Sequence, residues 1–382
     1  MSRKLKFNSN ALLFILLGLL IMAATIWYVI YYSINNAETS TKDKEITTSK
    51  DKLENKNTKK AAKKDGYSEV LISFGGDSTI GHDTKFAFAN SLPDVLSKNN
   101  NDFSYFYKNV ASIFKNDDIS IVNLETVFTN SKDRAEKQFN FKADPSYAQA
   151  LPLGHIEGVD ISNNHIYDYK QKGFDDTLEA LKTNNINYFG EGHTWIKEVN
   201  GVKFAFLGYT GYNDYAEFRQ KLEKDIKKLK DEGCIVIINL HWGSENSYYP
   251  TETQVNLAHF AIDKGADLII GHHPHVIQGI EQYNGKIICY SLGNFCFGGN
   301  FNPKDKDTFI FQAKYKLKNG KAESYGVKVI PCSISSVNYI NDYCPTPLQG
   351  EEKERVLKKL NGLSSKAGFK ITDEFYNIDV KN

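Results

Sequence analysis

The chain has 382 residues, a formal net charge of +1, 41% hydrophobic residues and 24% charged residues. This composition is typical of a globular protein with enough apolar side chains for one large core or two domains. The near-neutral charge gives no electrostatic reason to expect a nucleic acid as the partner.

The beginning of the chain predicts a membrane anchor. Basic Arg3, Lys4 and Lys6 precede an uncharged apolar run at residues 11–32 that ends in aromatic side chains. As a helix this run would measure roughly 33 Å, enough to cross a hydrocarbon core of about 30 Å. We expect a cytoplasmic segment at 1–10 and a retained single-pass signal anchor, which leaves the remaining chain on the outer side of the cell membrane. A cleaved signal peptide is the alternative, although the apolar run is long for one.

Composition marks two further boundaries along the chain. Residues 33–66 lack apolar periodicity and mix charged residues with Ser, Thr and Asn, which predicts a disordered linker. We expect a folded domain over residues 67–345. A lysine-rich helix near 351–361 and a polar tail form a C-terminal segment over 346–382.

The folded domain alternates two kinds of pattern. Short runs rich in β-branched and apolar residues predict buried strands, and amphipathic stretches between many of them predict helices at 174–184, 214–230 and 252–264. This alternation predicts an α/β fold. The last two strand patterns, at 308–317 and 326–334, have no helix between them and are expected to be antiparallel.

The five cysteines are an odd number and too few for a disulfide scaffold. Cys234 and Cys289 lie within apolar strand patterns, where we expect buried, unreactive thiols. A disulfide between Cys332 and Cys344 would require an oxidising compartment, and the sequence leaves this pairing open.

Polar side chains follow strand patterns repeatedly, and ligands bind outside the carboxyl ends of strands in α/β sheets. One shared site is therefore expected at these ends. Carboxylate, amide and imidazole groups together suit divalent Mn, Zn or Fe, and two ions about 3.5–4 Å apart can hold both oxygens of a displacement at phosphorus. A single Asp after a strand is most often a helix cap or turn former, so the argument depends on the recurrence. In chain order the residues are Asp77, Asn123, Glu125, Asn163, Asn164, His165, Asp168, His241, Glu245, His272, His273, His275 and Asn294.

The sequence GHHPHVIQ at 271–278 concentrates three histidines around Pro274. Because a residue before proline disfavours the α region, we expect His273 to be extended. Positions i and i+2 of an extended segment share a face, so His273 and His275 are the predicted ligands. His272 is expected to point away and to play a structural or supporting role.

The motifs GD…G, NLE, NNH…D, HWG.E, HPH..Q and SLGNF, in this order between about Leu71 and Phe297, resemble the CapA family of capsule-biosynthesis proteins. Members of that family serve poly-γ-glutamate production in bacteria and have the calcineurin-like metallophosphoesterase fold. The resemblance implies that 67–345 is a sandwich of two mixed β-sheets flanked by helices. It also implies one or two divalent metal ions at the strand ends.

The resemblance assigns roles to individual residues. His165 would be the acid near the leaving group, oriented by Asp168. The metal ligands would be Asp77, Glu125, Asn164, His241, His273 and His275. The expected substrate contacts are His82, Asn123, Asn163, Glu245 and Asn294. The Asp-x-His opening of metallophosphoesterases is absent because Ser78 and Thr79 follow Asp77, and His82 stands where capsule-type members usually carry arginine.

Three functions follow as hypotheses. The first is a membrane-anchored extracytoplasmic protein that supports synthesis or export of poly-γ-glutamate or a related envelope polymer, with a membrane synthetase complex as partner. The second is a stand-alone metal-dependent surface hydrolase of the metallophosphatase type, acting on a phosphoester or an amide of an envelope polymer. The third is a non-catalytic module that binds an anionic polymer, since a fold does not determine a function.

Overall fold

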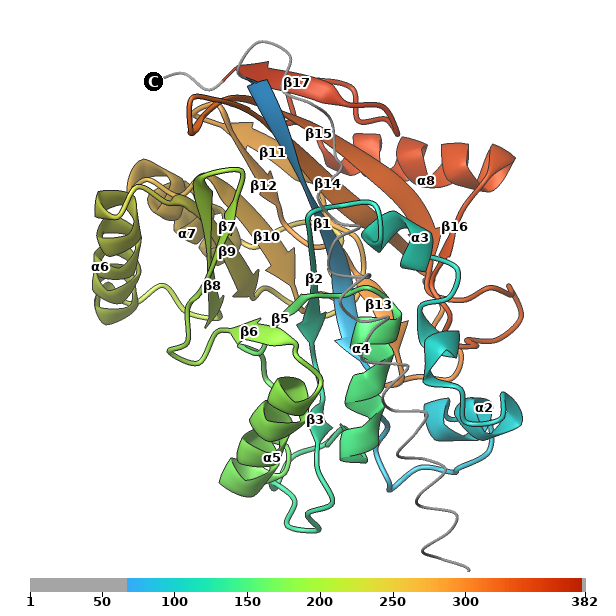
Figure 1. Ribbon diagram of the computed structural model, residues 1–382. Helices are drawn as coiled ribbons and strands as arrows, with labels where there is room; N and C mark the ends of the chain where they lie inside the picture. The colour runs from blue at the N-terminus through green and yellow to red at the C-terminus, as the bar shows by residue number, and fades with distance from the viewer. Residues whose placement is uncertain (1–66, 380–382) are drawn as a thin grey trace, which may run out of the picture. The chain divides into compact units, whose positions relative to one another are not determined.

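A computed structural model describes residues 67–379 (Figure 1). The predicted anchor at 11–32 and linker at 33–66 lie outside the described residues. Within 67–379, none of the helices has the length and apolar character needed to cross a membrane.

The first sheet is mixed and has strand order β16-β15-β14-β1-β2-β5-β6, with β13 beside β1 and β17 beside β15. The neighbours β1, β2, β5 and β6 are parallel, whereas β14 runs antiparallel to both β1 and β15. The predicted antiparallel pairing of the two late strands is thus confirmed. The strands are β1 (Tyr67–Thr79), β2 (Ile119–Leu124), β5 (Gly158–Asp160), β6 (Asn187–Phe189), β13 (Asn294–Phe297), β14 (Asp307–Lys318), β15 (Lys321–Ser333), β16 (Thr346–Pro347) and β17 (Tyr376–Asp379).

The second sheet is also mixed, with order β11-β12-β10-β9-β8-β7. Its four central strands are parallel and its two edge strands are antiparallel to their neighbours. The strands are β7 (Trp195–Val199), β8 (Val202–Thr210), β9 (Ile235–His241), β10 (Leu268–His272), β11 (Ile280–Tyr283) and β12 (Lys286–Cys289). A separate parallel pair joins β3 (Val127–Phe128) and β4 (Lys142–Ala143).

Helices correspond to all four sequence patterns that predicted them. These are α5 (Lys170–Thr183), α6 (Ala216–Asp231), α7 (Glu252–Asp263) and α8 (Gly350–Leu363). Three short helices without such patterns are α2 (Leu92–Lys98), α3 (Ala111–Phe114) and α4 (Ala150–Leu153), and 3₁₀ turns occur at Phe103–Phe106 and Pro145–Gln149. Helix α7 begins at a capping box, in which Thr251 and Gln254 each accept a hydrogen bond from the other's backbone N–H.

The apolar core has three layers, because side chains alternate between the two faces of each strand. Side chains of a strand point to opposite faces in turn. On β8, Phe204 and Phe206 belong to the core that the two sheets share, whereas Ala205 and Leu207 pack with α6 and α7 on the outer side of the second sheet. Figure 1 shows α6 beside β8 on that outer side.

The first sheet follows the same rule. Ile119 and Ile121 of β2 face the shared core, and Val122 and Leu124 face outward, where they pack with α5 and the short helices. The predicted architecture of two mixed sheets flanked by helices is therefore confirmed.

The C-terminal segment packs into the shared core as well. Val356, Leu357 and Leu360 of α8 and Ile378 of β17 join the same apolar cluster as Ile72 of β1. The described part of this predicted C-terminal segment, residues 346–379, thus contributes buried side chains to the sandwich.

All five cysteines are buried and free. Cys332 and Cys344, whose pairing the sequence left open, form no disulfide here. Burial raises the pKa of the Cys332 thiol to about 12 and that of the Cys344 thiol to about 11. Both are therefore unreactive thiols, as predicted for Cys234 and Cys289.

Candidate metal centre

The carboxyl ends of strands from both sheets meet at one edge. In the first sheet, Asp77 of β1 lies opposite Asn123 of β2 and Asn294 of β13. In the second sheet, His241 of β9 lies opposite His272 of β10. Figure 1 shows the arrowheads of β1, β2 and β10 pointing toward the same end of the domain. The strand register within each sheet therefore places side by side the polar residues that the sequence predicted at the strand ends.

Two glycines bend β1 so that Asp77 reaches this edge. The register of β1 against β2 shifts between Phe74 and Asp77, across Gly75 and Gly76, and a bulge of this kind redirects the side chains that follow it. A Cβ at Gly76 would lie 2.0 Å from the carbonyl oxygen of Gly293, so only glycine allows this close approach. The backbone N–H of Asp77 donates to the same carbonyl oxygen at 2.9 Å.

Asp77 is a buried carboxylate surrounded by imidazoles. Its Oδ1 accepts a hydrogen bond from Asn123 Nδ2 at 2.8 Å and lies 3.2 Å from His272 Nδ1. Its Oδ2 accepts from the backbone N–H of His273 at 3.2 Å and lies 3.4 Å from His275 Nδ1. Burial by itself would raise the pKa of Asp77, but the contacts from His272 and His275 outweigh it and hold that pKa well below its ordinary value.

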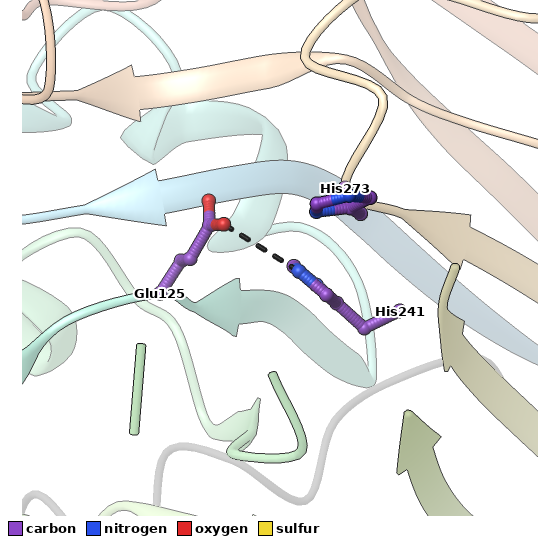
Figure 2. Close-up of side chains that lie close together, drawn as sticks. All are labelled: Glu125, His241 and His273. Atoms are coloured by element: carbon purple, nitrogen blue, oxygen red, sulfur yellow. Dashed lines mark ion pairs between the residues drawn. The ribbon is translucent and has the colours of Figure 1, made fainter. Parts of the chain in front are cut away.

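Glu125 lies across from Asp77 and is fully buried. Its Oε1 lies 3.5 Å from His241 Nε2 and 3.8 Å from His275 Nε2 but makes no hydrogen bond. Burial raises the pKa of Glu125 well above its ordinary value. Figure 2 shows the carboxylate directed at His241, with the ring of His273 beside it. An orphaned carboxylate oxygen facing imidazole nitrogens is the arrangement that a bound cation would complete.

Three side-chain amides hold the centre in place. Asn164 Oδ1 lies 2.9 Å from His241 Nε2, and Asn123 Nδ2 lies 3.2 Å from His241 Nδ1. Asn163 donates to Asn123 Oδ1 at 3.1 Å and accepts from the backbone N–H of His165 at 3.0 Å. The amides therefore link the imidazole of one sheet to the loop that carries His165.

Within residues 67–379, carboxylate and imidazole atoms form three overlapping groups, each with its ligand atoms within 4.8 Å of one another. Glu125 belongs to two of them, and so do His273 and His275. Glu245, expected to contact substrate, instead lies among the candidate ligands. The groups are Glu125, His241 and His273; Glu245, His273 and His275; and Asp77, Glu125 and His275.

The predicted conformation of the histidine cluster is wrong. His273 has φ +94° and His275 has φ +58°, so the segment is a turn and the alternation of an extended chain does not apply. Proline restricts the residue before it mainly through ψ, and the sequence does not reveal the sign of φ at His273. The two rings nevertheless lie 5.8 Å apart, within the same set of candidate ligands. His272 does not point away, because its Nδ1 contacts Asp77 and its Nε2 contacts Asn239.

The protonation of the two turn histidines differs because their neighbours differ. Burial and the nearby His275 lower the pKa of His273 to about 4. Burial also opposes protonation of His275, but the charges of Glu125 and Asp77 outweigh it and raise its pKa to about 10. Asn294, a predicted substrate contact, lies 2.9 Å from His275 Nδ1 through its Oδ1 and fixes that ring.

His165 and Asp168 form a pair beside the centre. His165 Nδ1 lies 2.7 Å from Asp168 Oδ2, and Asp168 also accepts from the backbone N–H of Phe141. Lys137 forms an ion pair with Asp168 Oδ1 at 2.5 Å and donates to the carbonyl oxygen of Asn164 at 2.6 Å. Because Asp168 engages Nδ1, Nε2 is the nitrogen of His165 that is available for proton transfer.

His82 is the predicted site residue that the structure places elsewhere. Its backbone pairs with Lys142, and it lines a cavity of about 160 Å³ together with Lys142, Pro93 and Tyr147. Among the described residues, its contacts do not include any of the candidate ligands.

Two residues of the site were missed at the sequence level. The hydroxyl of Tyr212 lies 3.2 Å from His273 Nδ1, and its ring stands edge-on to both His273 and His241. Tyr212 follows the 202–210 strand, so the strand-end rule could have found it. Lys137 comes from a polar loop that has no distinguishing pattern.

Comparison with known proteins assigns a family. The family model described as "Bacterial capsule synthesis protein PGA_cap" matches residues 71–299. The chain is 30% identical to the capsule biosynthesis protein CapA of Bacillus anthracis, over 78% of this chain and 74% of that protein. It is 29% identical to the PGA biosynthesis protein CapA of Bacillus subtilis (strain 168), over 82% of this chain and 84% of that protein.

Among solved structures, the chain is similar to a purple acid phosphatase from yellow lupin, Lupinus luteus. The TM-score is 0.35 and the identity is 7%, over 73% of this chain and 54% of that chain. A similarity this weak gives no basis for assigning roles to residues of this chain.

Proposed function

The chain belongs to the PGA_cap family of bacterial capsule synthesis proteins, and on this basis we propose that it supports synthesis or export of poly-γ-glutamate or a related anionic envelope polymer. The names of the two CapA relatives, one a capsule and one a PGA biosynthesis protein, support this role. The apolar run at 11–32 supports attachment to the cell membrane, with the folded domain outside and a membrane synthetase complex as partner.

The observation that carries a metal-dependent role is the buried Glu125. Its Oε1 has no hydrogen bond, and Glu125 belongs to two candidate ligand groups. An isolated buried carboxylate is costly, and a shared cation would offset that cost. The mixed set of carboxylate, imidazole and amide donors suits Mn, Zn or Fe. The proposed ligands are Asp77, Glu125, Asn164, His241, His273 and His275, with Glu245 at the exposed side.

A second candidate function, hydrolysis of a polymer bond, is favoured by the pair of His165 and Asp168. A divalent ion held by these ligands would polarise a substrate oxygen and lower the pKa of a water. The side chains of the protein would supply the proton transfer and the orientation of the ligands. Asp168 holds Nδ1 of His165, so that Nε2 delivers a proton to a leaving group, and Tyr212 and Asn294 orient the rings of His273 and His275.

Elemental analysis of the purified full-length chain tests the metal site. We expect bound Mn, Zn or Fe in the wild type and its loss in a His273→Ala/His275→Ala variant. His193→Ala is the matched control, since that exposed histidine contacts Tyr188 and should leave the metal content unchanged. A wild-type chain free of metal after growth and dialysis with each of these ions would overturn the metal-dependent role.

Complementation of a gene deletion tests the polymer role and separates catalysis from binding. We expect deletion to abolish surface polymer and the wild-type gene to restore it. A His165→Ala gene should fail to restore it if the pair performs chemistry. Full restoration by His165→Ala would favour a binding role, and unchanged polymer after deletion would exclude the polymer function.

A further inference from the structure

We propose that a ladder of aromatic rings next to His165 is the platform on which the anionic, amide-linked polymer approaches the site. The ladder consists of Phe86, Phe139 and Phe141. This inference rests on the proposed polymer function and names the surface that the polymer would occupy.

The rings form a continuous series from the surface to the site. Phe86 is 57% exposed and Phe139 is 37% exposed, whereas Phe141 is buried. The ring centroids of Phe86 and Phe139 are 6.0 Å apart, those of Phe139 and Phe141 are 6.3 Å apart, and the ring of Phe141 lies 4.4 Å from that of His165. Single exposed apolar residues need no explanation, whereas adjoining exposed rings form an apolar patch of the kind that marks an interaction site.

The ladder is held rigidly against the site. The backbone N–H of Phe141 donates to Asp168, the carboxylate that holds His165. The neighbouring Asn140 N–H donates to the buried Asp83 at 3.0 Å, and Asp83 in turn pairs with Arg134 at 2.8 Å. A rigid surface needs little ordering when a ligand binds, which favours affinity.

Positive charge accompanies the rings. Lys137 lies two residues before Phe139, is 30% exposed and contacts Asp168 and the carbonyl oxygen of Asn164. Arg134 keeps 23% of its side chain exposed beside Asp83. Lys85 adjoins Phe86 in the chain. The surface beside the ladder therefore carries the exposed Lys85, and Lys137 and Arg134 keep part of their side chains exposed beside their carboxylate partners.

The chemistry of the proposed polymer fits this combination. Each repeat of poly-γ-glutamate contributes a planar amide, a short methylene stretch and a carboxylate. Amide planes and methylene groups lie well on aromatic faces, and carboxylates pair with lysine and arginine. A polymer lying along the ladder would bring one amide bond toward the ring of His165.

Calorimetric titration of the full-length chain in detergent micelles with a ten-residue γ-linked glutamate oligomer tests the proposal. Relative to wild type, we expect roughly tenfold weaker binding for Phe86→Ala/Phe139→Ala and near wild-type binding for Phe139→Tyr, which keeps the ring. Tyr376→Ala is the matched control, because that ring belongs to β17, outside the ladder, is 41% exposed and stacks on Phe369. An unchanged metal content in each variant would show that the centre is intact.

Hydrogen–deuterium exchange on the wild type gives a second measurement. We expect the oligomer to protect the segments 83–91 and 135–141. Protection by phosphatidylglycerol bicelles but not by the oligomer would overturn the proposal and assign the ladder to a lipid surface.

The outcomes separate this inference from the function on which it rests. Equal oligomer affinity in the wild type and the Phe86→Ala/Phe139→Ala variant would overturn the ladder and leave the polymer function standing. An absence of oligomer binding in the wild type would also overturn the ladder, and the complementation experiment would then decide the polymer function by itself.

Discussion

At the scale of single residues, the burial of the Glu125 carboxylate favours metal binding and destabilises the metal-free fold. Glu125 Oε1 lacks a hydrogen bond, so in a metal-free chain its desolvation cost is offset only in part, by the charge of His275. A bound ion would reverse the sign of this contribution.

Glu125→Gln should therefore have opposite effects in the two states. Without metal, we expect the free energy of unfolding at pH 8 to rise by about 1 kcal/mol, because a buried ionisable group is removed. With saturating Mn²⁺, we expect a decrease of about 2 kcal/mol, because a ligand is lost. Urea unfolding in EDTA and in Mn²⁺ measures both, and a change of the same sign in the two conditions would contradict the ligand role.

Asp117 gives a pH-dependent prediction away from the centre. Burial raises its pKa to about 7, and Ser120 donates a hydrogen bond to it at 2.8 Å. The folded state then holds a proton that the unfolded state releases near pH 4, so stability falls as the pH rises from about 4 to about 7. We expect Asp117→Asn to reduce this pH-dependent decrease in the free energy of unfolding by on the order of 1–2 kcal/mol. Thermal unfolding at pH 5 and pH 7 would show it, and an unaltered pH slope would contradict the assignment.

Single residues also mark the limit of what the sequence predicts. The strand-end rule brought Asp77, Glu125 and His241 to one place because it depends only on chain direction. The conformation of His273 depended on the sign of its φ, which local sequence does not determine. Lys137 forms a tertiary contact with Asp168 that no local sequence pattern predicts.

At the scale of elements, long apolar runs became strands and amphipathic stretches became helices nearly as predicted, since their periodicity determines which face is buried. Some of the short elements were not predicted. β13 (Asn294–Phe297) has only four residues and exists because it pairs with β1 at Asp77. The small β3–β4 pair likewise depends on a contact between segments distant in the chain.

Two glycine substitutions test the geometry of these elements. Gly76→Ala should lower the free energy of unfolding by more than about 2 kcal/mol and reduce metal content, because its Cβ would collide with the backbone of Gly293 in the bulge. Gly362→Ala in α8 has open space and should be neutral or stabilising by up to about 1 kcal/mol. Thermal unfolding compares the two, and equal effects would contradict this account of the bulge.

At the scale of the whole domain, the C-terminal helix belongs to the core that the two sheets share. Leu360 is 1% exposed and lies in the same cluster as residues of β1 and β14. Arg355 and Lys359 of α8 also form ion pairs with Asp307 at the start of β14. The sandwich therefore depends on residues beyond 345.

Leu360→Ala should lower the free energy of unfolding by about 2–5 kcal/mol in a single transition. Leu153→Ala is the matched control, because that side chain is 48% exposed and its loss should cost no more than about 0.5 kcal/mol. Circular dichroism and tryptophan fluorescence followed in the same titration would test the cooperativity. A separate early transition would mean that α8 unfolds independently.

The five buried cysteines have a practical consequence. Since all five thiols are buried and their pKa values are raised, maleimide and nitroxide reagents should not react with the native chain. A cysteine introduced at Tyr339, whose side chain is 76% exposed, would then be the single labelled position without replacement of any native cysteine. A spin label placed there would report the depth and orientation of the domain at a lipid bilayer.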